Sequence, residues 1–457
     1  MAASLLLAGC AFWPESANLS SIKSADSLAH STTFSAPAAA WPTDRWWESF
    51  GDAQLNRLIN EGLAGATDLR VARARFTRAE ALAGQARSQL RPSLQADAEG
   101  GSTRQSYNFT RNPSQWDEYG QFSFNLTWEL DFWGRNRAAL AAALSEVEAE
   151  RAETAATRLT VSAGIASAYA ELASLFAEYD AARQAVEVRS QTLALMRERE
   201  ASGLENLGAT EQAQSALSTA RGEVASIEES ITLTRYRIAA LLGAGPDRGL
   251  SIKAPAVRSQ AVAALPANIP AELLGRRPDI LAAKLRSEAA ASRIKQARAA
   301  FYPNINLGAL VGMQSLGLDN LLKPDSKFGT IGPAISLPIF DGGYLRGQQR
   351  AAEADYESAV AQYDAALVQA LHDVADAIAS ERALRQRLAY AQDAERAAQN
   401  AWTVANNRYR GGLATYLDVL TAEDALITSR RAVATLQARA FSLDVALIRA
   451  LGGGFRS

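Results

Sequence analysis

The sequence predicts a mostly α-helical protein with a small β part, in which long coiled-coil helical hairpins occur twice and four strands per chain can cross a membrane. Three observations lead to this fold class. The 457 residues contain an internal duplication, the second copy holds 63 residues without Gly or Pro, and several short runs alternate between apolar and polar side chains.

Composition excludes several classes of function. Lys and Arg total 47 and Asp and Glu total 49, so the chain lacks the basic surface that binds a phosphate backbone, and we expect no nucleic-acid partner. Its only imidazoles and thiol are His30, His372 and Cys10, too few for most transition-metal sites. We expect no bound metal, no cofactor and, because no catalytic constellation is present, no enzyme activity.

The chain is two copies of one pattern. Residues 68–94 match residues 279–305 at an offset of 211, and residues 134–243 match residues 343–452 at an offset of 209 without a gap. A repeat of this length is far longer than the 20–50 residues of a solenoid unit, so it is a duplicated half-molecule. The predicted organisation is a leader over 1–9, a tail and equatorial segment over 10–53, a first repeat over 54–243, a linker over 244–278, a second repeat over 279–452 and a short end over 453–457.

Each repeat centres on one long helix. Residues Gln348–Arg410 would form about 95 Å of helix. Its apolar residues recur in steps of four and three, with only Glu381 and Glu395 interrupting, and the first copy keeps the same phase with a break at Arg189. Such a repeat predicts left-handed coiled coils. The flanking helices, 24 and 39 residues by sequence, would stack end to end beside it.

Four strands are expected, over about 93–103, 119–130, 305–314 and 329–339. The second is the clearest, because its apolar and polar residues alternate over ten positions. No run of about 18 apolar residues could form a spanning helix, so strands would have to cross the bilayer. The predicted lipid-facing residues are Phe122, Phe124, Leu126 and Trp128.

Four strands cannot close a membrane barrel, whose minimum is about eight, so several chains must pool them. The residues alone leave a dimer, a trimer or a tetramer open, and a soluble four-stranded sheet packed on a helix is the alternative. Aromatic residues cluster at the strand ends, as in an interfacial belt. They are Trp116, Tyr119, Phe132, Trp133, Phe301 and Tyr302.

The amino terminus resembles a bacterial lipoprotein signal. An apolar run ends in Leu7-Ala8-Gly9-Cys10, which is similar to a lipobox, although no basic segment precedes it. The resemblance implies that the leader is truncated, that cleavage falls before Cys10, and that this thiol carries the lipid that anchors the chain. Ala11 is compatible with passage to the outer membrane. A disordered end with a chance cysteine is the alternative.

Several motifs together resemble the TolC-type outer-membrane factors, in particular the lipoprotein branch of OprM- and NodT-like efflux subunits. The motifs are Arg276-Arg277-Pro278-Asp279-Ile280, Leu337-Pro338-Ile339-Phe340-Asp341-Gly342-Gly343, Arg408-Tyr409-Arg410-Gly411-Gly412-Leu413 and Arg449-Ala450-Leu451-Gly452-Gly453-Gly454. The resemblance implies a homotrimer whose twelve-stranded barrel in outer-membrane lipid continues as a helical periplasmic tunnel. It also implies a passive exit duct for small molecules in a tripartite pump, with a periplasmic adaptor and an inner-membrane transporter of the RND type as partners.

The same resemblance assigns site residues. It implies that Leu417 lies at an apolar constriction, Asp418 at an acidic ring and Tyr409 at a link between hairpins, while Thr421 occupies a position that is usually aspartate. The hairpin tips are expected to contact the adaptor through Gly203, Leu204, Gly412 and Leu413. Each of these residues also has a simpler alternative role. Asp418 could be a solvated surface carboxylate, the glycines could be plain helix caps, and Tyr409 could simply pack in the core.

Two other functions remain open. A lipid-anchored coiled-coil tether without a pore would need the long helices but not the lipid-facing strands. A type I secretion duct would carry polypeptides through the same fold. The sequence does not identify the cargo.

Overall fold

The computed structural model describes residues 18–24, 27–28, 40–104, 116–257, 273 and 275–456. The chain divides into two compact units, whose boundaries fall within helices α2, α4, α8 and α9. One unit comprises Ala74–Arg151 and Ala282–Asp364 with the start of the chain, and contains the sheet. The other comprises Lys23–Arg73, Ala152–Leu281 and Ala365–Ser457, and contains both hairpin tips.

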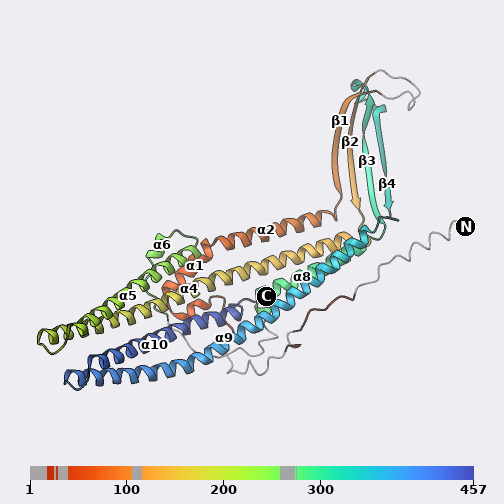
Figure 1. The fold of residues 1–457 in the computed structure, drawn as a ribbon. Coiled ribbons are helices and arrows are strands. Elements are labelled where there is room, and N and C mark those ends of the chain that lie inside the picture. Colours follow the sequence, from red (N-terminus) through yellow and green to blue (C-terminus); the bar gives the residue numbers. More distant parts are fainter. Residues whose placement is uncertain are drawn as a thin grey trace. The chain divides into compact units, whose positions relative to one another are not determined.

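The helices and strands follow the predicted order (Figure 1). Their bounds are α1 Ala53–Gly65, α2 Thr67–Ser88, β1 Ser93–Thr103, β2 Asp117–Glu129, α4 Arg135–Ala201, α5 Leu207–Leu241, α6 Asp247–Leu250, α8 Pro278–Ala299, β3 Asn304–Leu316, β4 Lys327–Ser336, α9 Tyr344–Arg410 and α10 Tyr416–Ala450. The described residues also form three short 3-10 helices, Trp46–Phe50, Leu318–Asn320 and Pro324–Ser326.

The two copies have equal helix lengths. In each, a long helix of 67 residues, α4 or α9, is flanked by helices of 22 and 35 residues. Helix α9 begins four residues before the predicted start, because Asp341 accepts hydrogen bonds from the backbone N–H groups of Gly343 and Leu345 and caps the first turn. The two flanking helices together fall ten residues short of the long one.

The flanking helices meet end to end in the unit that holds the tips. Arg277, at the start of α8, donates a 3.2 Å hydrogen bond to the carbonyl of Ala450, the last residue of α10. In the first copy, a Cβ added to Gly243 would lie 2.6 Å from the carbonyl oxygen of Gly65, and one added to Gly452 in the second copy would overlap the carbonyl oxygen of Arg276. Backbone contact at both joints therefore supports the predicted stacking.

The heptad positions form the core of this unit. Ile165 and Leu172 of α4 are fully buried, as are Leu367 and Val374 of α9. Helix α4 is long and apolar enough to cross a membrane by length and composition, but half of its most apolar window is buried inside the fold. Within this unit it therefore serves as a core helix.

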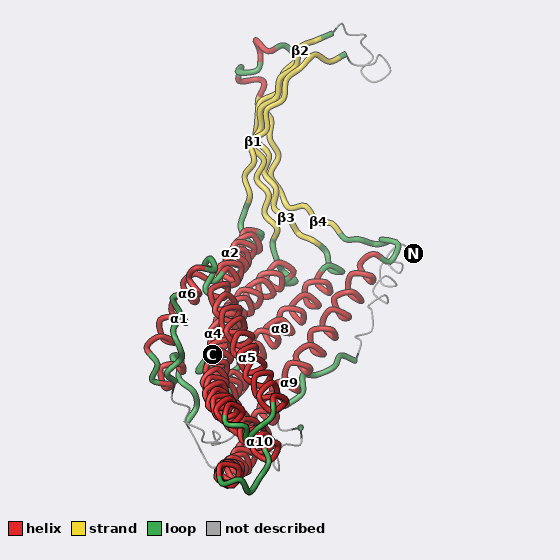
Figure 2. The backbone as a smooth tube through the Cα atoms, turned by 60° about the vertical axis from the view of Figure 1, so that its left-hand side comes forward, coloured by secondary structure: helices red, strands yellow, loops and turns green. Residues whose placement is uncertain are grey.

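The four strands form one antiparallel sheet in the order β1-β2-β3-β4 (Figure 2). Strand β4 ends at Ser336, three residues before the predicted end. Its last partner is Asn304, which follows Pro303, and Pro338 has no N–H to donate, so the ladder cannot continue. The sheet has two unpaired edges among the described strands, β1 and β4.

Candidate functional site

The two hairpin tips are built alike. At the end of α4, the N–H of Leu204 bonds the carbonyl of Arg199, and at the end of α9 the N–H of Leu413 bonds that of Arg408, both over 2.8 Å. This bond closes a Schellman turn, which needs a left-handed residue one position earlier. Gly203 and Gly412 occupy that position, as predicted, with φ of 65° and 72°.

The tips expose apolar side chains. Leu204, Leu413 and Leu417 are 65%, 72% and 63% exposed. Leu207, which the sequence analysis did not single out, is 63% exposed at the start of α5. Leu207 directly follows Asn206, whose side chain caps α5 by accepting a hydrogen bond from the N–H of Ala209. Both tips therefore leave leucine side chains in solvent.

Asp418 has a local role that the sequence did not predict. Its Oδ2 accepts hydrogen bonds of 2.8 Å from both the N–H and the hydroxyl of Thr415, which forms a capping box at the start of α10. These bonds hold the pKa of Asp418 below its usual value, so the carboxylate stays charged. The hydroxyl of Thr421 has a partner within its own helix, because it donates a hydrogen bond to the carbonyl of Leu417.

Tyr409 connects the two hairpins. Its ring is 2% exposed, and its hydroxyl donates a 2.8 Å bond to Oε2 of Glu205 at the tip of the first hairpin. The Arg199 guanidinium lies 4.6 Å from the ring centroid. Burial and the Glu205 carboxylate raise the pKa of Tyr409 to about 12, so its hydroxyl remains a donor. Tyr409 therefore both packs and links, two roles that the sequence could not separate.

A second polar contact joins the hairpins through Arg189, the residue that interrupts the heptads of α4. Its Nη2 lies 2.6 Å from Oδ1 of Asp424 on α10, and its Nε lies 3.8 Å from Oε1 of Glu423. Glu423 is 1% exposed and accepts a 2.9 Å bond from the hydroxyl of Thr192. Sequence reasoning marked the break but did not predict its partners.

The strand register separates two faces of the sheet. Leu126 pairs with Leu94 of β1 and with Ala309 of β3, and Ala309 pairs with Ile331 of β4, so all four project to one face. Phe122, Phe124 and Trp128 lie on this face, because they are an even number of residues from Leu126. The other face carries the side chains of Gln95, Asp97, Glu99, Gln121, Ser123, Asn125 and Thr127.

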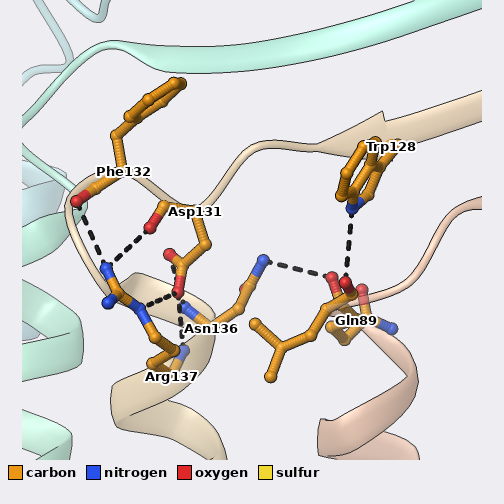
Figure 3. A network of polar contacts seen from close by, with 7 residues as sticks. Gln89, Trp128, Asp131, Phe132, Asn136 and Arg137 are labelled. Carbon is orange, nitrogen blue, oxygen red and sulfur yellow. Dashed lines mark hydrogen bonds and ion pairs between the residues drawn. The ribbon is translucent and has the colours of Figure 1, made fainter.

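A polar elbow joins β2 to α4 (Figure 3). The Asp131 carboxylate accepts hydrogen bonds from the backbone N–H groups of Asn136 and Arg137. The Arg137 side chain donates to the backbone carbonyl groups of Asp131 and Phe132. Beside the elbow, the Trp128 indole donates to the carbonyl of Leu90. The elbow therefore fixes how the chain leaves the strand and enters the helix.

The predicted lipidation site receives no test from the geometry. Cys10 lies outside the described residues. Among the residues that are described, no group of three or more His, Cys, Asp or Glu side chains could hold a metal ion.

Comparison with known proteins identifies the class of protein that this fold and these faces define. The sequence matches the outer membrane efflux protein family twice, over residues 58–244 and 269–453, and the chain belongs to that family. The recognition as a TolC-type outer-membrane factor is confirmed. The chain is an efflux channel protein of the bacterial outer membrane, and the family is a class of channels rather than of enzymes.

Similarity to individual proteins supports the same class. The chain is 35% identical over 366 residues to the fusaric acid resistance protein FusA of Burkholderia cepacia, covering 78% of this chain and 68% of that one. It is 29% identical to the multidrug resistance outer membrane protein MdtQ of Escherichia coli, over 99% and 96% of the two chains. The crystal structure of the outer membrane protein VceC of Vibrio cholerae is 45% identical, with a TM-score of 0.87 over 91% of this chain and 100% of that one. The predicted fold class, function and location are thus confirmed.

Proposed function

We propose that three copies of this chain form one continuous duct. The observation that carries this proposal is the register: the four strands share one apolar face, β1 and β2 present polar side chains on the opposite face, and the described sheet keeps two unpaired edges. Pairing β4 of one copy with β1 of the next satisfies both edges. Three copies supply twelve strands, enough to close a barrel with lipid outside and water inside.

The hairpin tips then form the inner aperture of the duct. Leu417 supplies an apolar constriction and Asp418 a ring of three fixed negative charges, which favours cations in a narrow pore. Thr421 adds no second ring, because its hydroxyl carries no charge. Tyr409 holds the two hairpins of each copy together through Glu205, and the aperture opens when they separate.

The exposed leucines support a partner role for the tips. Leu204 and Leu413 follow the turn glycines Gly203 and Gly412 directly and leave more than half of their side chains in solvent. We infer that a periplasmic adaptor binds them and connects the duct to an inner-membrane transporter of the RND type. Transport energy is supplied by that transporter, and the duct needs neither catalysis nor a cofactor.

The N-terminal tail supports a lipid anchor at Cys10. The backbone N–H of Ser20 donates a 2.7 Å bond to Glu357 of α9, and the hydroxyl of Tyr356 donates a 3.1 Å bond to the carbonyl of Ser20. Tyr356 lies 12 residues, about 18 Å of helix, from the start of α9 at the sheet end. The ten residues from Cys10 to Ser20 reach about 33 Å when extended, so a lipid on Cys10 can enter the membrane.

The cargo is proposed to be small molecules. FusA and MdtQ are named for resistance to fusaric acid and to multiple drugs, which favours small solutes over secreted polypeptide. A tether without a pore would not need the lipid-facing row of the four strands.

Single-channel recording tests the duct. The purified protein, reconstituted in planar bilayers, should form cation-preferring pores and should migrate as a trimer in mild detergent. A trimer that never conducts at any voltage would favour the tether. Polypeptide secretion without small-molecule export in cells would favour the type I duct.

A further inference from the structure

The two hairpins pack against each other near their tips through an apolar cluster, which we call the tip seam. Its residues come from α4, α5, α9 and α10 and are Leu193, Met196, Ala209, Ala213, Leu217, Tyr409, Tyr416 and Val419. Separating a purely apolar seam would return its buried surface to water at about 25 cal/mol per Å². Such a seam would hold the hairpins together and resist opening.

Two charged residues on the same helices, Arg189 of α4 and Glu423 of α10, also meet between the hairpins, and their contact is poor. The side chain of Arg189 is 16% exposed and that of Glu423 only 1%. The 3.8 Å between Arg189 Nε and Glu423 Oε1 is too long for a hydrogen bond, and this buried Nε has no hydrogen-bond partner among the described residues. Glu423 accepts only from Thr192 in the described part of the chain, although a carboxylate has about four acceptor sites.

Burying such a pair costs free energy. Each ion loses its hydration, and the mutual attraction offsets that loss only when the geometry is good and the remaining donors and acceptors are satisfied. Neither condition holds for the contact between Arg189 and Glu423. Arg189 also pairs with Asp424 over 2.6 Å, but that carboxylate is 56% exposed, so the pair contributes little and leaves Glu423 without a close cation. Both ions recover full hydration when the hairpins part, so the pair lowers the free energy needed to separate them.

The duplication shows that the fold itself does not require a charge here. The residue that corresponds to Arg189 in the second copy is Ala398, at the offset of 209, and it lies at an apolar heptad position of α9. The residue that corresponds to Glu423 in the first copy is the uncharged Gln214. The buried pair is therefore a property of the seam between the hairpins rather than of the hairpin repeat.

We propose that Arg189 and Glu423 act as a release element, which weakens the tip seam so that the two hairpins can separate. This inference rests on the proposed opening of the aperture by hairpin separation. The opposite role would be an ion pair that stabilises the closed seam. Removing both charges would then make the hairpins separate more easily. Removing a release element makes them separate less easily, because apolar side chains of similar volume pack without a hydration cost.

The test replaces both residues together, as Arg189→Met with Glu423→Met, and measures access to the seam. Val419 is 3% exposed in the cluster, so a Val419→Cys reporter reacts with a maleimide only when the seam opens. Cys10 is the only native cysteine, and labelling of the protein without the reporter is subtracted. In the full trimer, we expect the double variant to label about tenfold more slowly than the protein with the native pair.

An exposed ion pair between the same hairpins provides the matched control. Arg431 of α10 and Glu223 of α5 lie 2.8 Å apart, with side chains 42% and 43% exposed. Such pairs contribute little, so Arg431→Met with Glu223→Met should leave the labelling rate within about twofold of the original.

The outcomes separate this inference from the proposed function. The release element is overturned if the Arg189/Glu423 double variant labels as fast as, or faster than, the protein with the native pair. Faster labelling would show that the pair stabilises the closed seam. Equal slowing by both double variants would also overturn it, because added apolar surface alone would explain the result. Labelling does not require conduction, so slowed labelling in a trimer that never conducts would support the release element and reject the duct.

Discussion

The hydroxyl of Tyr409, in the last turn of α9, donates a hydrogen bond to the carboxylate of Glu205 at the opposite hairpin tip, over 2.8 Å. A hydrogen bond to a charged acceptor typically contributes about 1.5–3 kcal/mol, and partial exposure of Glu205 places this one near the lower end. Tyr409→Phe removes the donor while keeping the ring. We expect at least a fivefold rise in open probability in single-channel recordings.

Tyr416 is the control for that change. It is 6% exposed, its ring centroid lies 6.4 Å from that of Tyr409, and its hydroxyl makes no hydrogen bond within the described residues. Tyr416→Phe should therefore leave open probability unchanged within about twofold. If the two variants behave alike, the Tyr409 hydroxyl does not link the hairpins.

The capping box separates two roles of Asp418. Asp418→Ala removes both the charge and the cap of α10, which costs about 1 kcal/mol of helix stability. Asp418→Asn removes the charge but keeps an oxygen that can accept from Thr415. If the ring of charges sets ion preference, the two variants should lower cation selectivity equally, measured as reversal potential in a salt gradient. A change in the alanine variant alone would mean that the cap, not the charge, matters.

The sequence predicted the architecture more fully than the contacts between its parts. Helix lengths and the heptad phase follow from local spacing, so α9 differed from expectation only where Asp341 caps it. The partners of Arg189 could not be predicted in this way. Glu423 lies 234 residues later in the chain, and only the packed hairpins bring the two residues together.

For the strands, too, the local pattern was easier to predict than the contacts between elements. Large apolar residues make the alternation in β2 visible, whereas glycines and small residues weaken it in β3 and β4. Register pairs Ala309 with Ile331 and so places both on the apolar face. Leu207 was missed because nothing local distinguishes an exposed leucine at a helix start from a buried one.

Glu423 makes the tip seam sensitive to pH. Burial raises the pKa of its carboxyl despite the hydrogen bond from Thr192 and the attraction of Arg189, and Asp424 raises it further. Tyr409 and Tyr416, the two tyrosines of the tip seam, each have a pKa of about 12 and stay neutral. The closed seam thus binds a proton more tightly than separated hairpins do.

The direction of the pH dependence follows from this tighter proton binding by the closed seam. The extra stability of the closed seam is complete below the ordinary pKa of a glutamate and is lost as pH rises through the raised value. Open probability should therefore be lower at pH 5 than at pH 7.5, and Glu423→Gln should flatten that dependence. An unchanged pH profile in Glu423→Gln would assign the titration to another group.

The assignment of the apolar face of β2 can be tested by comparing substitutions on the two faces of this strand. Phe124→Asp or Leu126→Asp would place a carboxylate in lipid. Arg and Lys cost about 2–4 kcal/mol near the bilayer midplane, and Asp and Glu cost less than that. Asn125→Asp adds the same group on the opposite face, where water would solvate it. We expect reduced outer-membrane trimer for the first two variants and normal amounts for the third. Normal insertion of all three would mean that the faces are assigned wrongly.

The joint between α10 and α8 predicts a position-specific cost for a single methyl group. Gly452 has a φ of 89°, and an added Cβ would overlap the backbone carbonyl of Arg276. Gly452→Ala therefore combines left-handed strain of roughly 1–2 kcal/mol with a clash that only backbone movement can relieve. Gly412→Ala is the matched control, because its φ of 72° is similar but no atom lies within 4 Å of its Cβ position. Thermal unfolding of the detergent-solubilised trimer should show a larger loss for Gly452→Ala, and equal losses would mean that the end-to-end contact is loose.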